Sequence, residues 1–423
     1  TGNSTVGRTV AHNLGVAPAW MVIKCTNAAR NWCTYHISLG NGYQIILNGT
    51  AAKESTALWN STTPTATEFT LGNDADVNGT GNTYVAYLFA SDAGGFGDDG
   101  SESIIKCGSY VGSGDTAPYV VSVDLGFEPQ WLLVKNVTTG GAGKNWLLVD
   151  TMRGFHATGA DKELRPNTSD AENDSSAFNV TSTGFSSGSG GEPNQQGNTY
   201  IYIAIRRPMK TPESGTEVFA IDTYGSTGDG AQPGFRSTFP VDMALRVDTS
   251  EASNEISSRL TQGKWMYTNL TNAEASQSLV QFDYQNGWFA ATGTASNYYS
   301  WMFKRATGFM DVVAYTGNAT FGRTVTHGLG AVPEMIIVKA RNKAEGWPVY
   351  HAGMASDAET DVIFLQGNAP FGDNGTFWAD TKPTATNFTL GTNGAVNDNS
   401  TYNYIAYLFA TLAGVSKVGS YTG

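Results

Sequence analysis

Four short segments with alternating apolar positions recur along the chain, at residues 84–90, 200–206, 298–304 and 404–410. One set of alternate positions is large and apolar in every copy, whereas the opposite set varies from alanine to arginine and lysine. The recurring apolar residues are Val85, Tyr87, Phe89, Ile201, Ile203, Ile205, Tyr299, Trp301, Phe303, Ile405, Tyr407 and Phe409. A period of two predicts β-strands. We therefore expect four half-buried strands whose variable side faces solvent or a neighbour.

A second feature that occurs four times is a turn leading into a short aliphatic run. Its clearest copies lie at residues 12–24 and 327–339, a third lies at 124–135 and a divergent fourth at 239–247. Gly and Pro punctuate turns, and a short β-branched or aliphatic run between such residues predicts a buried strand. Only brief segments such as 254–260 suggest helix. The predicted fold class is all-β, with tandem β-sandwich-like modules.

Each copy of the repeat is interpreted as ending in a closing strand with a terminal tyrosine, namely Tyr110, Tyr224, Tyr315 and Tyr421. These tyrosines lie about 90–115 residues apart, close to the size of a two-sheet sandwich. We expect each module to bury its own apolar side. The predicted modules are residues 1–110, residues 111–224, a divergent third at 225–315, and a fourth at 316–423 that is most like the first.

The first and fourth repeats share details that the other two lack, such as Gly-Arg-Thr-Val at residues 7–10 and 322–325. The simplest interpretation is a super-period of three dissimilar repeats, whose fourth copy opens the next round. The last residues, 421–423, match the start of a repeat, and residues 1–3 continue as though the same tyrosine preceded them. We therefore expect the chain to begin inside a longer protein with more such triplets.

The composition narrows the possible partners. Only 15% of the 423 residues are charged, 50 are glycines, and the net charge is −12. A net negative charge repels phosphate backbones and anionic membrane surfaces, which argues against nucleic acid as a partner. A hydrophobic content of 40% is too high for a disordered chain, and no apolar run approaches the ~20 residues of a membrane helix. We expect no membrane insertion.

Three cysteines, Cys25, Cys33 and Cys107, are too few for a disulfide framework, and no C-x-x-C pair is present. Small buried apolar side chains are the favoured interpretation, with a bridge between Cys25 and Cys33 as the alternative. Stability is then expected to come from packing.

Candidate chemistry is sparse. Residues 184–188 fit G-x-S-x-G, but they lie in Ser- and Gly-rich sequence that favours a loop over a nucleophile elbow. Two matched histidine pairs, His12 with His36 and His327 with His351, lack the third ligand that a metal site needs. Structural hydrogen bonding is the favoured role, with metal binding or a pH-sensitive contact as alternatives.

Two acidic stretches, residues 74–79 and 97–102, resemble parts of calcium loops, although Val85 stands where the first needs a bidentate Glu. Solvated loops are the favoured interpretation. No carboxylate pair, phosphate loop or dinucleotide fingerprint stands out. The sequence therefore predicts no enzyme, no catalytic residue, no metal and no cofactor, and it leaves the binding residues unknown.

Aromatic residues can serve as packing or as binding platforms. Trp59 and Trp378 occupy matched positions, which favours the core. Trp288, Tyr298 and Tyr299 occur in the third repeat alone, so they are the better candidates for contacts with a partner.

The repeat motifs resemble a known tandem repeat. Gly-Arg-Thr-Val-x-His-x-Leu-Gly-x-x-Pro, Tyr-x-Ala-Tyr-Leu-Phe-Ala, and the linkers at 104–110 and 309–317 look like those of large structural proteins of marine bacteriophages. The third repeat departs most, with Phe239 and Pro240 in place of Leu-Gly. The resemblance covers essentially the whole chain, implies a virion component such as a tail fibre or another host-facing appendage, and assigns no site residues.

The leading functional hypothesis is a non-enzymatic virion structural protein with a role in host surface attachment, located on the outside of the extracellular particle. Its expected partners are other virion proteins, a host surface glycan or receptor, and further copies of the chain in a homo-oligomer. Capsid-surface decoration, a polysaccharide depolymerase and a bacterial surface adhesin are the alternatives.

Overall fold

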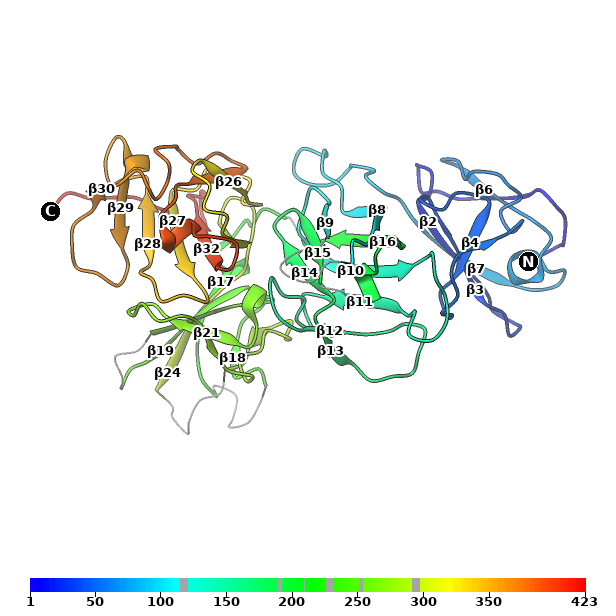
Figure 1. The fold of residues 1–423 in the computed structure, drawn as a ribbon, viewed down its shortest axis with the longest axis horizontal. Coiled ribbons are helices and arrows are strands. Elements are labelled where there is room, and N and C mark those ends of the chain that lie inside the picture. The colour runs from blue at the N-terminus through cyan, green and yellow to red at the C-terminus, as the bar shows by residue number, and fades with distance from the viewer. Residues whose placement is uncertain (115–120, 189–191, 209, 226–231, 251–253, 291–296) are drawn as a thin grey trace.

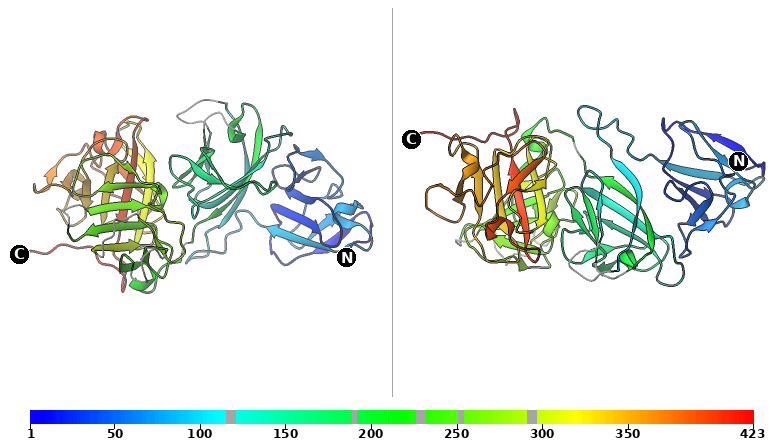
Figure 2. Two further views of the ribbon diagram at one scale, coloured as in Figure 1. Left: turned by 90° about the horizontal axis from the view of Figure 1, so that it is seen from below. Right: turned by 45° about the horizontal axis from the view of Figure 1, so that its top comes forward.

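The chain forms four groups of strands: the first and second follow one another along the long axis of the molecule, and the third and fourth together form its other end (Figure 1). The computed structural model describes residues 1–114, 121–188, 192–208, 210–225, 232–250, 254–290 and 297–423. The N-terminus and the C-terminus lie at opposite ends, and units 3 and 4 lie beside each other at the C-terminal end (Figure 1, Figure 2). We refer to the four groups as units 1 to 4. The all-β architecture expected from the sequence is confirmed.

Unit 1 has a five-stranded antiparallel sheet in the order β5-β4-β3-β2-β7, and a two-stranded sheet of β1 and β6. Its elements are β1 (Arg8–Ala11), β2 (Trp20–Cys25), β3 (Trp32–His36), β4 (Tyr43–Ile46), β5 (Glu54–Ser55), β6 (Glu68–Leu71), α1 (Ala75–Asn78) and β7 (Tyr84–Phe89).

Unit 2 has a four-stranded main sheet, β11-β10-β16-β8, with a three-stranded sheet β14-β15-β9 and the pair β12-β13. Its elements are β8 (Ile105–Val111), β9 (Val121–Asp124), β10 (Pro129–Asn136), β11 (Trp146–Asp150), β12 (Asp161–Glu163), β13 (Asn173–Ser175), β14 (Phe178–Thr181), β15 (Gly184–Ser187), the 3-10 turn η1 (Glu192–Asn194) and β16 (Thr199–Arg206).

Unit 3 has a six-stranded main sheet, β17-β24-β19-β20-β21-β22, and the pair β18-β23. Its elements are η2 (Gly215–Glu217), β17 (Phe219–Thr223), β18 (Phe235–Arg236), β19 (Met243–Asp248), β20 (Asn254–Ser258), η3 (Arg259–Thr261), β21 (Lys264–Tyr267), β22 (Ala275–Ser276), β23 (Gly287–Trp288) and β24 (Tyr298–Phe303). The segment that suggested helix, 254–260, is therefore a strand followed by one tight turn.

Unit 4 repeats this plan with the main sheet β25-β32-β27-β28-β29-β30 and the pair β26-β31. Its elements are β25 (Met310–Thr316), β26 (Arg323–Thr326), β27 (Met335–Ala340), β28 (Pro348–His351), η4 (Ala358–Thr360), β29 (Asp361–Phe364), β30 (Gly372–Asp373), β31 (Asn387–Leu390), α2 (Gly394–Asn397) and β32 (Asn403–Phe409).

The strands that end near a tyrosine open a unit rather than close one. Strand β8 pairs with β16, β17 pairs with β24, and β25 pairs with β32, in each case inside the sheet of the unit that follows. The sequence-based module limits 1–110, 111–224, 225–315 and 316–423 are therefore wrong by one strand. The error arose because each of these strands pairs with a strand that lies most of a unit further along the chain. The spacing of the tyrosines alone does not show whether such a strand belongs to the unit before it or to the unit after it.

The turn before each aliphatic strand explains the Leu-Gly motif. Gly15, Gly126 and Gly330 adopt φ angles of +80°, +78° and +70°, a region in which a side chain is strained. Pro240 stands at this place in unit 3, and proline is confined to φ near −65°, so the turn of unit 3 has a different backbone path.

In each unit the small sheet covers one face of the main sheet. In unit 1, Met21 and Ile23 of β2 pack with Phe69 and Leu71 of β6 in one apolar cluster. Units 3 and 4 have equivalent clusters between their own main and small sheets. This packing is the sandwich-like module that the sequence predicts.

The other face of each main sheet packs against the next unit. In the first pair, Trp20 and Val22 of unit 1 share a cluster with Leu133, Ile201 and Ile203 of unit 2. The expectation of half-buried strands is wrong for β16 and β32, whose central residues are buried on both sides. The recurring apolar residues face the neighbouring unit, and the variable side faces the unit's own core.

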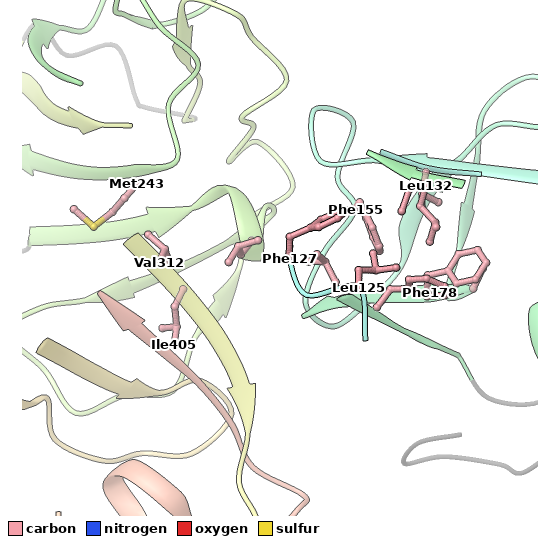
Figure 3. Close-up of a cluster of buried hydrophobic side chains, with 14 of the residues drawn as sticks. Leu125, Phe127, Leu132, Phe155, Phe178, Met243, Val312 and Ile405 are labelled. Carbon is pink, nitrogen blue, oxygen red and sulfur yellow. The ribbon is translucent and has the colours of Figure 1, made fainter. Parts of the chain in front are cut away.

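The largest cluster extends across units 2, 3 and 4, so the modules do not bury their apolar sides independently. Met243 of unit 3 lies in one cluster with Val312 and Ile405 of unit 4 and with Leu132 and Phe178 of unit 2. Figure 3 shows the residues of unit 2 on one side and those of units 3 and 4 on the other. Four further clusters are separate, so no single interior spans the chain.

Candidate functional site

The matched histidines support the backbone of turns. The Nδ1 atom of His327 accepts a hydrogen bond from the backbone N–H of Leu329 (3.3 Å), so Nε2 carries the proton and donates to the carbonyl oxygen of Thr384 (3.2 Å). His12 makes the same two contacts in unit 1. With both ring nitrogens engaged, these histidines have no lone pair left for a metal. The structural role that the sequence favoured is confirmed for both.

His36 links two units. Its Nε2 lies 3.1 Å from the carbonyl oxygen of Tyr202 in unit 2, and its Nδ1 accepts from the backbone N–H of Ser38. Burial lowers the pKa of His36 to about 4, because the charged imidazolium is poorly solvated there. His351, its counterpart in unit 4, is half-buried and bonds only locally, to the N–H of Gly353 (3.0 Å).

The stretch 74–79 is a helix cap rather than a calcium loop. Asp74 accepts from the backbone N–H of Asp76 (2.7 Å) and caps the single turn of α1. The amide of Asn78 is buried and donates to the carbonyl oxygens of Gly72 (2.7 Å) and Thr5 (3.0 Å). These side chains therefore fix the path of the chain around α1.

The carboxylates of the second acidic stretch each have a different partner. Glu102 forms an ion pair with Arg206 (3.1 Å), and Asp98 accepts from the hydroxyl of Thr211 (2.6 Å). Asp99 accepts hydrogen bonds from a serine two residues further on. In the described part of the chain, no three His, Cys, Asp or Glu side chains come together as a metal site requires.

The G-x-S-x-G segment forms strand β15, which lies between β14 and β9 in a three-stranded sheet. The expectation of a loop is therefore wrong. Gly184 and Gly188 have a packing role, because an added Cβ would lie 1.9 Å from the carbonyl oxygen of Val123 in β9 or of Ser176 before β14, respectively. Ser186 is buried in the middle of this strand and has none of the exposure of an elbow nucleophile.

The cysteines and most candidate aromatics belong to the interior. Cys25, Cys33 and Cys107 are free and buried, which confirms the favoured interpretation. Trp288 is also buried, and its indole N–H donates to Ser300 (2.9 Å), so the expectation that it contacts a partner is wrong.

Trp59 and Trp378 are buried as well, which confirms their assignment to the core. Tyr298 is half-buried, whereas Tyr299 is 41% exposed. Tyr299 is therefore the one of these candidates that is open to a partner.

The junction between units 1 and 2 is built around a lysine and a tryptophan on adjacent strands. The buried indole N–H of Trp146 donates to the carbonyl oxygen of Ile46 in unit 1 (3.0 Å). The ammonium group of Lys135, paired with Trp146 across the sheet, donates to the carbonyl oxygens of Lys144 (2.8 Å) and Thr50 (3.4 Å). Two side chains of unit 2 thus bind the backbone at the edge of unit 1.

Units 3 and 4 repeat this junction. The indole N–H of Trp347 lies 3.0 Å from each of the carbonyl oxygens of Tyr267 and Leu270, and the ammonium group of Lys339 donates to Thr271 (3.0 Å). Burial lowers the pKa of Lys339 to about 8, and it does the same to Lys135 in the first junction. We call these two contacts the lysine–tryptophan junctions.

The pair is present in unit 1 and absent from unit 3. Lys24 lies 5.7 Å from the ring centroid of Trp32, the same distance as between Lys339 and Trp347, and donates to the carbonyl oxygen of Arg30 within unit 1. Trp32 is half-buried and packs against the cluster that units 1 and 2 share. Unit 3 has Val247 and Asn254 at these positions.

An ionic cluster joins units 2, 3 and 4. The guanidinium of Arg305, which is 4% exposed, contacts Glu128 of unit 2 at 2.7 Å and Asp242 of unit 3 at 3.7 Å. Asp311 of unit 4 pairs with Arg207 at 2.8 Å and lies 4.0 Å from Arg305. Burial opposes the charge of Arg305, but these carboxylates outweigh it, so the pKa of Arg305 is raised.

A cavity of about 250 Å³ adjoins this cluster between units 2 and 4. Its ionisable lining is engaged: Glu102 pairs with Arg206, and Asp311 accepts from the backbone N–H of Gly328 (2.7 Å). The arrangement stabilises a junction and offers no free acid and base.

Sequence reasoning missed both kinds of junction. The Lys–Trp pairs carried a signal, because they recur at matched positions in units 1, 2 and 4. The ionic cluster had no comparable signal in the sequence, since Glu128 and Arg305 are separated by 177 residues.

Comparison with known proteins identifies one family. The family described as "Domain of unknown function (DUF7483)" matches residues 1–208 and 240–423. The chain belongs to this family. No curated protein matches the chain.

The two DUF7483 matches coincide with the two pairs of units. The first extends over β1 to β16 and the second over β19 to β32, so each contains one lysine–tryptophan junction. The structure thus groups the units in twos, whereas the likeness of the first and fourth repeats suggests a period of three. The existence of further triplets stays a prediction. None of the helices in the described residues is long and apolar enough to cross a membrane.

Proposed function

We propose that this DUF7483 chain is a non-enzymatic structural and adhesive module of a phage particle, part of a tail fibre or another host-facing appendage. It would lie on the outside of the virion and bind a host surface glycan or receptor. The proposal rests on the resemblance of the repeats to marine phage structural proteins, on the end-to-end arrangement of the units, and on one exposed aromatic surface.

The end-to-end arrangement suits a spacer. The termini lie at opposite ends of the molecule (Figure 2), and the lysine–tryptophan junctions and the ionic cluster hold neighbouring units together. Units that are packed through buried tryptophans and ion pairs resist bending between them. A protein of this form carries its outer surface away from the point where it is attached.

The exposed aromatic surface is the observation that supports attachment most strongly. Trp301 and Tyr299 on β24 are 38% and 41% exposed, and the adjacent Ile221 is 58% exposed. The equivalent residues Ile203 and Tyr407 are buried against neighbouring units, whereas Tyr87 of unit 1 is 46% exposed. Unit 3 thus leaves open part of a face that units 2 and 4 bury at this position. We call Ile221, Tyr299 and Trp301 the unit 3 platform.

The chemistry of this platform fits a glycan. Flat aromatic rings stack on the apolar face of a sugar, and tryptophan and tyrosine dominate the energetics of many binding interfaces. The low content of charged residues, 15%, leaves a surface of hydroxyl and amide groups that can hydrogen-bond to sugar hydroxyls. The net charge of −12 disfavours nucleic acid as the ligand.

The test is binding of the fluorescently labelled chain to host cells and to their purified surface polysaccharide. We expect Trp301→Ala to weaken binding at least tenfold, because it removes the largest ring of the platform. Phe321→Ala is the matched control, since Phe321 is an exposed aromatic residue (58%) that lies in unit 4. Equal binding by Trp301→Ala and the wild-type chain would refute the platform.

Further outcomes distinguish the alternatives. Immunogold labelling of particles on the capsid rather than the tail would indicate capsid-surface decoration. Loss of polysaccharide viscosity on incubation with the chain would indicate a depolymerase. A gene located among bacterial surface genes would indicate an adhesin.

A further inference from the structure

A groove of about 360 Å³ lies between units 2 and 4. Its walls come from β9, β14 and β15 of unit 2 and from β25 and β26 of unit 4. In Figure 1, β9, β14 and β15 lie on the side of unit 2 that is turned toward unit 4. A volume of this size is typical of sites that bind small molecules. We call this cavity the unit 2–4 groove.

The wall from unit 2 is a row of hydroxyl and amide groups. The register of the small sheet places Asn179, Ser186 and Ser122 side by side on β14, β15 and β9. Phe178 and Phe185, which alternate with them along the strands, are buried in the core. Because neighbouring residues of a strand point to opposite faces, the polar row faces out of unit 2 and into the groove.

The hydroxyl of Ser186 lacks a partner inside the protein. Ser186 is only 8% exposed, and none of the described residues forms a hydrogen bond with its Oγ atom. Buried hydroxyl groups nearly always have a hydrogen-bond partner. Since Ser186 lines the groove, the group that completes its bonding comes from the groove. The hydroxyls of Ser122, Thr181 and Ser182 also line it, and no described residue engages them.

Unit 4 contributes a second polar wall. Thr324 and Thr326 of β26 are exposed and line the groove, whereas Val325 between them is buried in the core of unit 4. At the end of β25, the hydroxyl of Thr316 donates to the amide oxygen of Asn403 (3.0 Å). This contact orients the amide of Asn403, and none of the described residues accepts a hydrogen bond from its nitrogen. The two units thus supply donors and acceptors on both sides of one cavity.

The charged groups of the groove are already engaged. Arg341 is 1% exposed and pairs with Glu274 (2.8 Å). Arg323 donates to the carbonyl oxygen of Thr316 and lies 5.3 Å from the ring centroid of Tyr315. The described lining residues include no Asp, Glu, Lys or His. The groove therefore favours an uncharged ligand, and its described lining lacks the carboxylate pair that glycoside hydrolysis uses.

We propose that the unit 2–4 groove binds a neutral oligosaccharide, which bonds to the Ser122, Asn179 and Ser186 row on one wall and to the two threonines of β26 on the other. A sugar hydroxyl is both a donor and an acceptor, and so are the Ser and Thr hydroxyls that face it. The inference rests on the proposed function, because it assigns a site and a chemical class to the glycan. Its residues are separate from the unit 3 platform.

A ligand that is held by both walls joins the two units. Such a ligand binds the folded chain but not the unfolded one, so it stabilises the fold in proportion to its occupancy. We expect the melting temperature of the chain to rise with the concentration of a sugar that binds the groove. Differential scanning calorimetry of the full chain measures this rise.

The first test is a titration of the full chain by saturation-transfer NMR. The probes are trisaccharides of glucose, of mannose and of galactose, from about 0.1 to about 10 mM, a range that covers weak binding. We expect at least one probe to bind saturably. Thr324→Val should weaken that binding about three- to tenfold, the change that follows from the loss of one hydrogen bond.

The first repeat provides the matched control for this variant. Thr9 has the place of Thr324 in the shared Gly-Arg-Thr-Val motif, and it is exposed as well, but it does not line the groove. Thr9→Val should therefore leave binding unchanged. Both substitutions keep the shape of the side chain and lie on exposed strand positions, so both variants should fold.

The second test fills the groove. Thr326→Trp places a large ring on the wall from unit 4 and should abolish binding of the trisaccharides. Ala11 has the same place in the first repeat and is also exposed, so Ala11→Trp is the matched control and should bind like the wild type. A trisaccharide of galacturonic acid should bind no more tightly than the neutral probes.

Three results would overturn the proposal. They are a wild-type chain that binds none of the neutral probes at about 10 mM, a Thr326→Trp variant that binds them like the wild type, and clearly tighter binding of the acidic trisaccharide. Trp301→Ala should leave trisaccharide binding in the groove unchanged. A chain that binds cells through Trp301 but binds no trisaccharide would refute the groove alone, whereas groove binding without cell binding would refute only the proposed function.

Discussion

The indole N–H of Trp146 lies 3.0 Å from the carbonyl oxygen of Ile46, across the junction between two units. We predict that Trp146→Phe lowers the free energy of unfolding by about 1–3 kcal/mol, because a buried acceptor loses its donor and the smaller ring fills less space. Urea unfolding followed by far-UV circular dichroism measures this change.

The matched control is Trp32→Phe. Trp32 has the same place in unit 1 but is only half-buried. We expect its substitution to cost clearly less than that of Trp146, because less of its ring is removed from water. Equal losses for Trp32→Phe and Trp146→Phe would show that the junction contributes nothing.

The ionic cluster gives a second prediction. We expect Arg305→Met to lower the free energy of unfolding by about 3–5 kcal/mol, because Glu128 would remain buried without the guanidinium that contacts it at 2.7 Å. Differential scanning calorimetry of the full chain measures the loss. Lys210→Met removes an exposed pair with Glu213 and should leave the melting temperature almost unchanged, because water screens that pair. A small loss for Arg305→Met would contradict the role of the cluster.

A third prediction concerns pH. The pKa of His36 is about 4 in the folded chain and near 6.5 when unfolded, so the unfolded state binds more protons between these values. The stability that His36 contributes is therefore present above pH 6.5 and is lost as pH falls toward 4. We expect the difference in unfolding free energy between wild type and His36→Gln to shift in favour of the variant over this range.

Urea titrations at several pH values measure the effect of His36. The control is His351→Gln, whose half-buried ring accepts a hydrogen bond from the N–H of Gly353 in its own unit. A difference between wild type and His36→Gln that does not change with pH would contradict the account.

A fourth prediction concerns the thiols. Burial raises the pKa of Cys33 and of Cys107 to about 12, so at pH 8 neither forms the reactive thiolate. Cys25 is buried as well. We expect a thiol reagent such as DTNB to leave all three unmodified in the native chain and to modify all three in denaturant. Rapid modification of the native chain would show that these interiors open.

Local sequence patterns predicted the strands but not the partners of their faces. The alternation around Tyr407 indicated that one face of the strand is apolar. It did not indicate whether that face packs inside its own unit or against a neighbouring unit, because both produce the same alternation. The Gly and Ser residues of 184–188 have the composition of a loop. The glycines are needed for a different reason, the close approach of neighbouring backbone, which is visible only in three dimensions.

The candidate surfaces were predictable only where repeats could be compared. Tyr299 was singled out as specific to one repeat, and it is exposed. Trp288 was singled out for the same reason and is buried, because its bond to Ser300 depends on a pairing of strands that the sequence does not show.

The central claim is that an opening strand completes the main sheet of units 2, 3 and 4, and hydrogen exchange of the full chain tests it most directly. We predict slow exchange in β8, β17 and β25, because their backbone N–H groups are bonded inside the sheets, and rapid exchange in residues 419–423, which are exposed and in no strand. Exchange of β8 as rapid as that of residues 419–423 would contradict the claim.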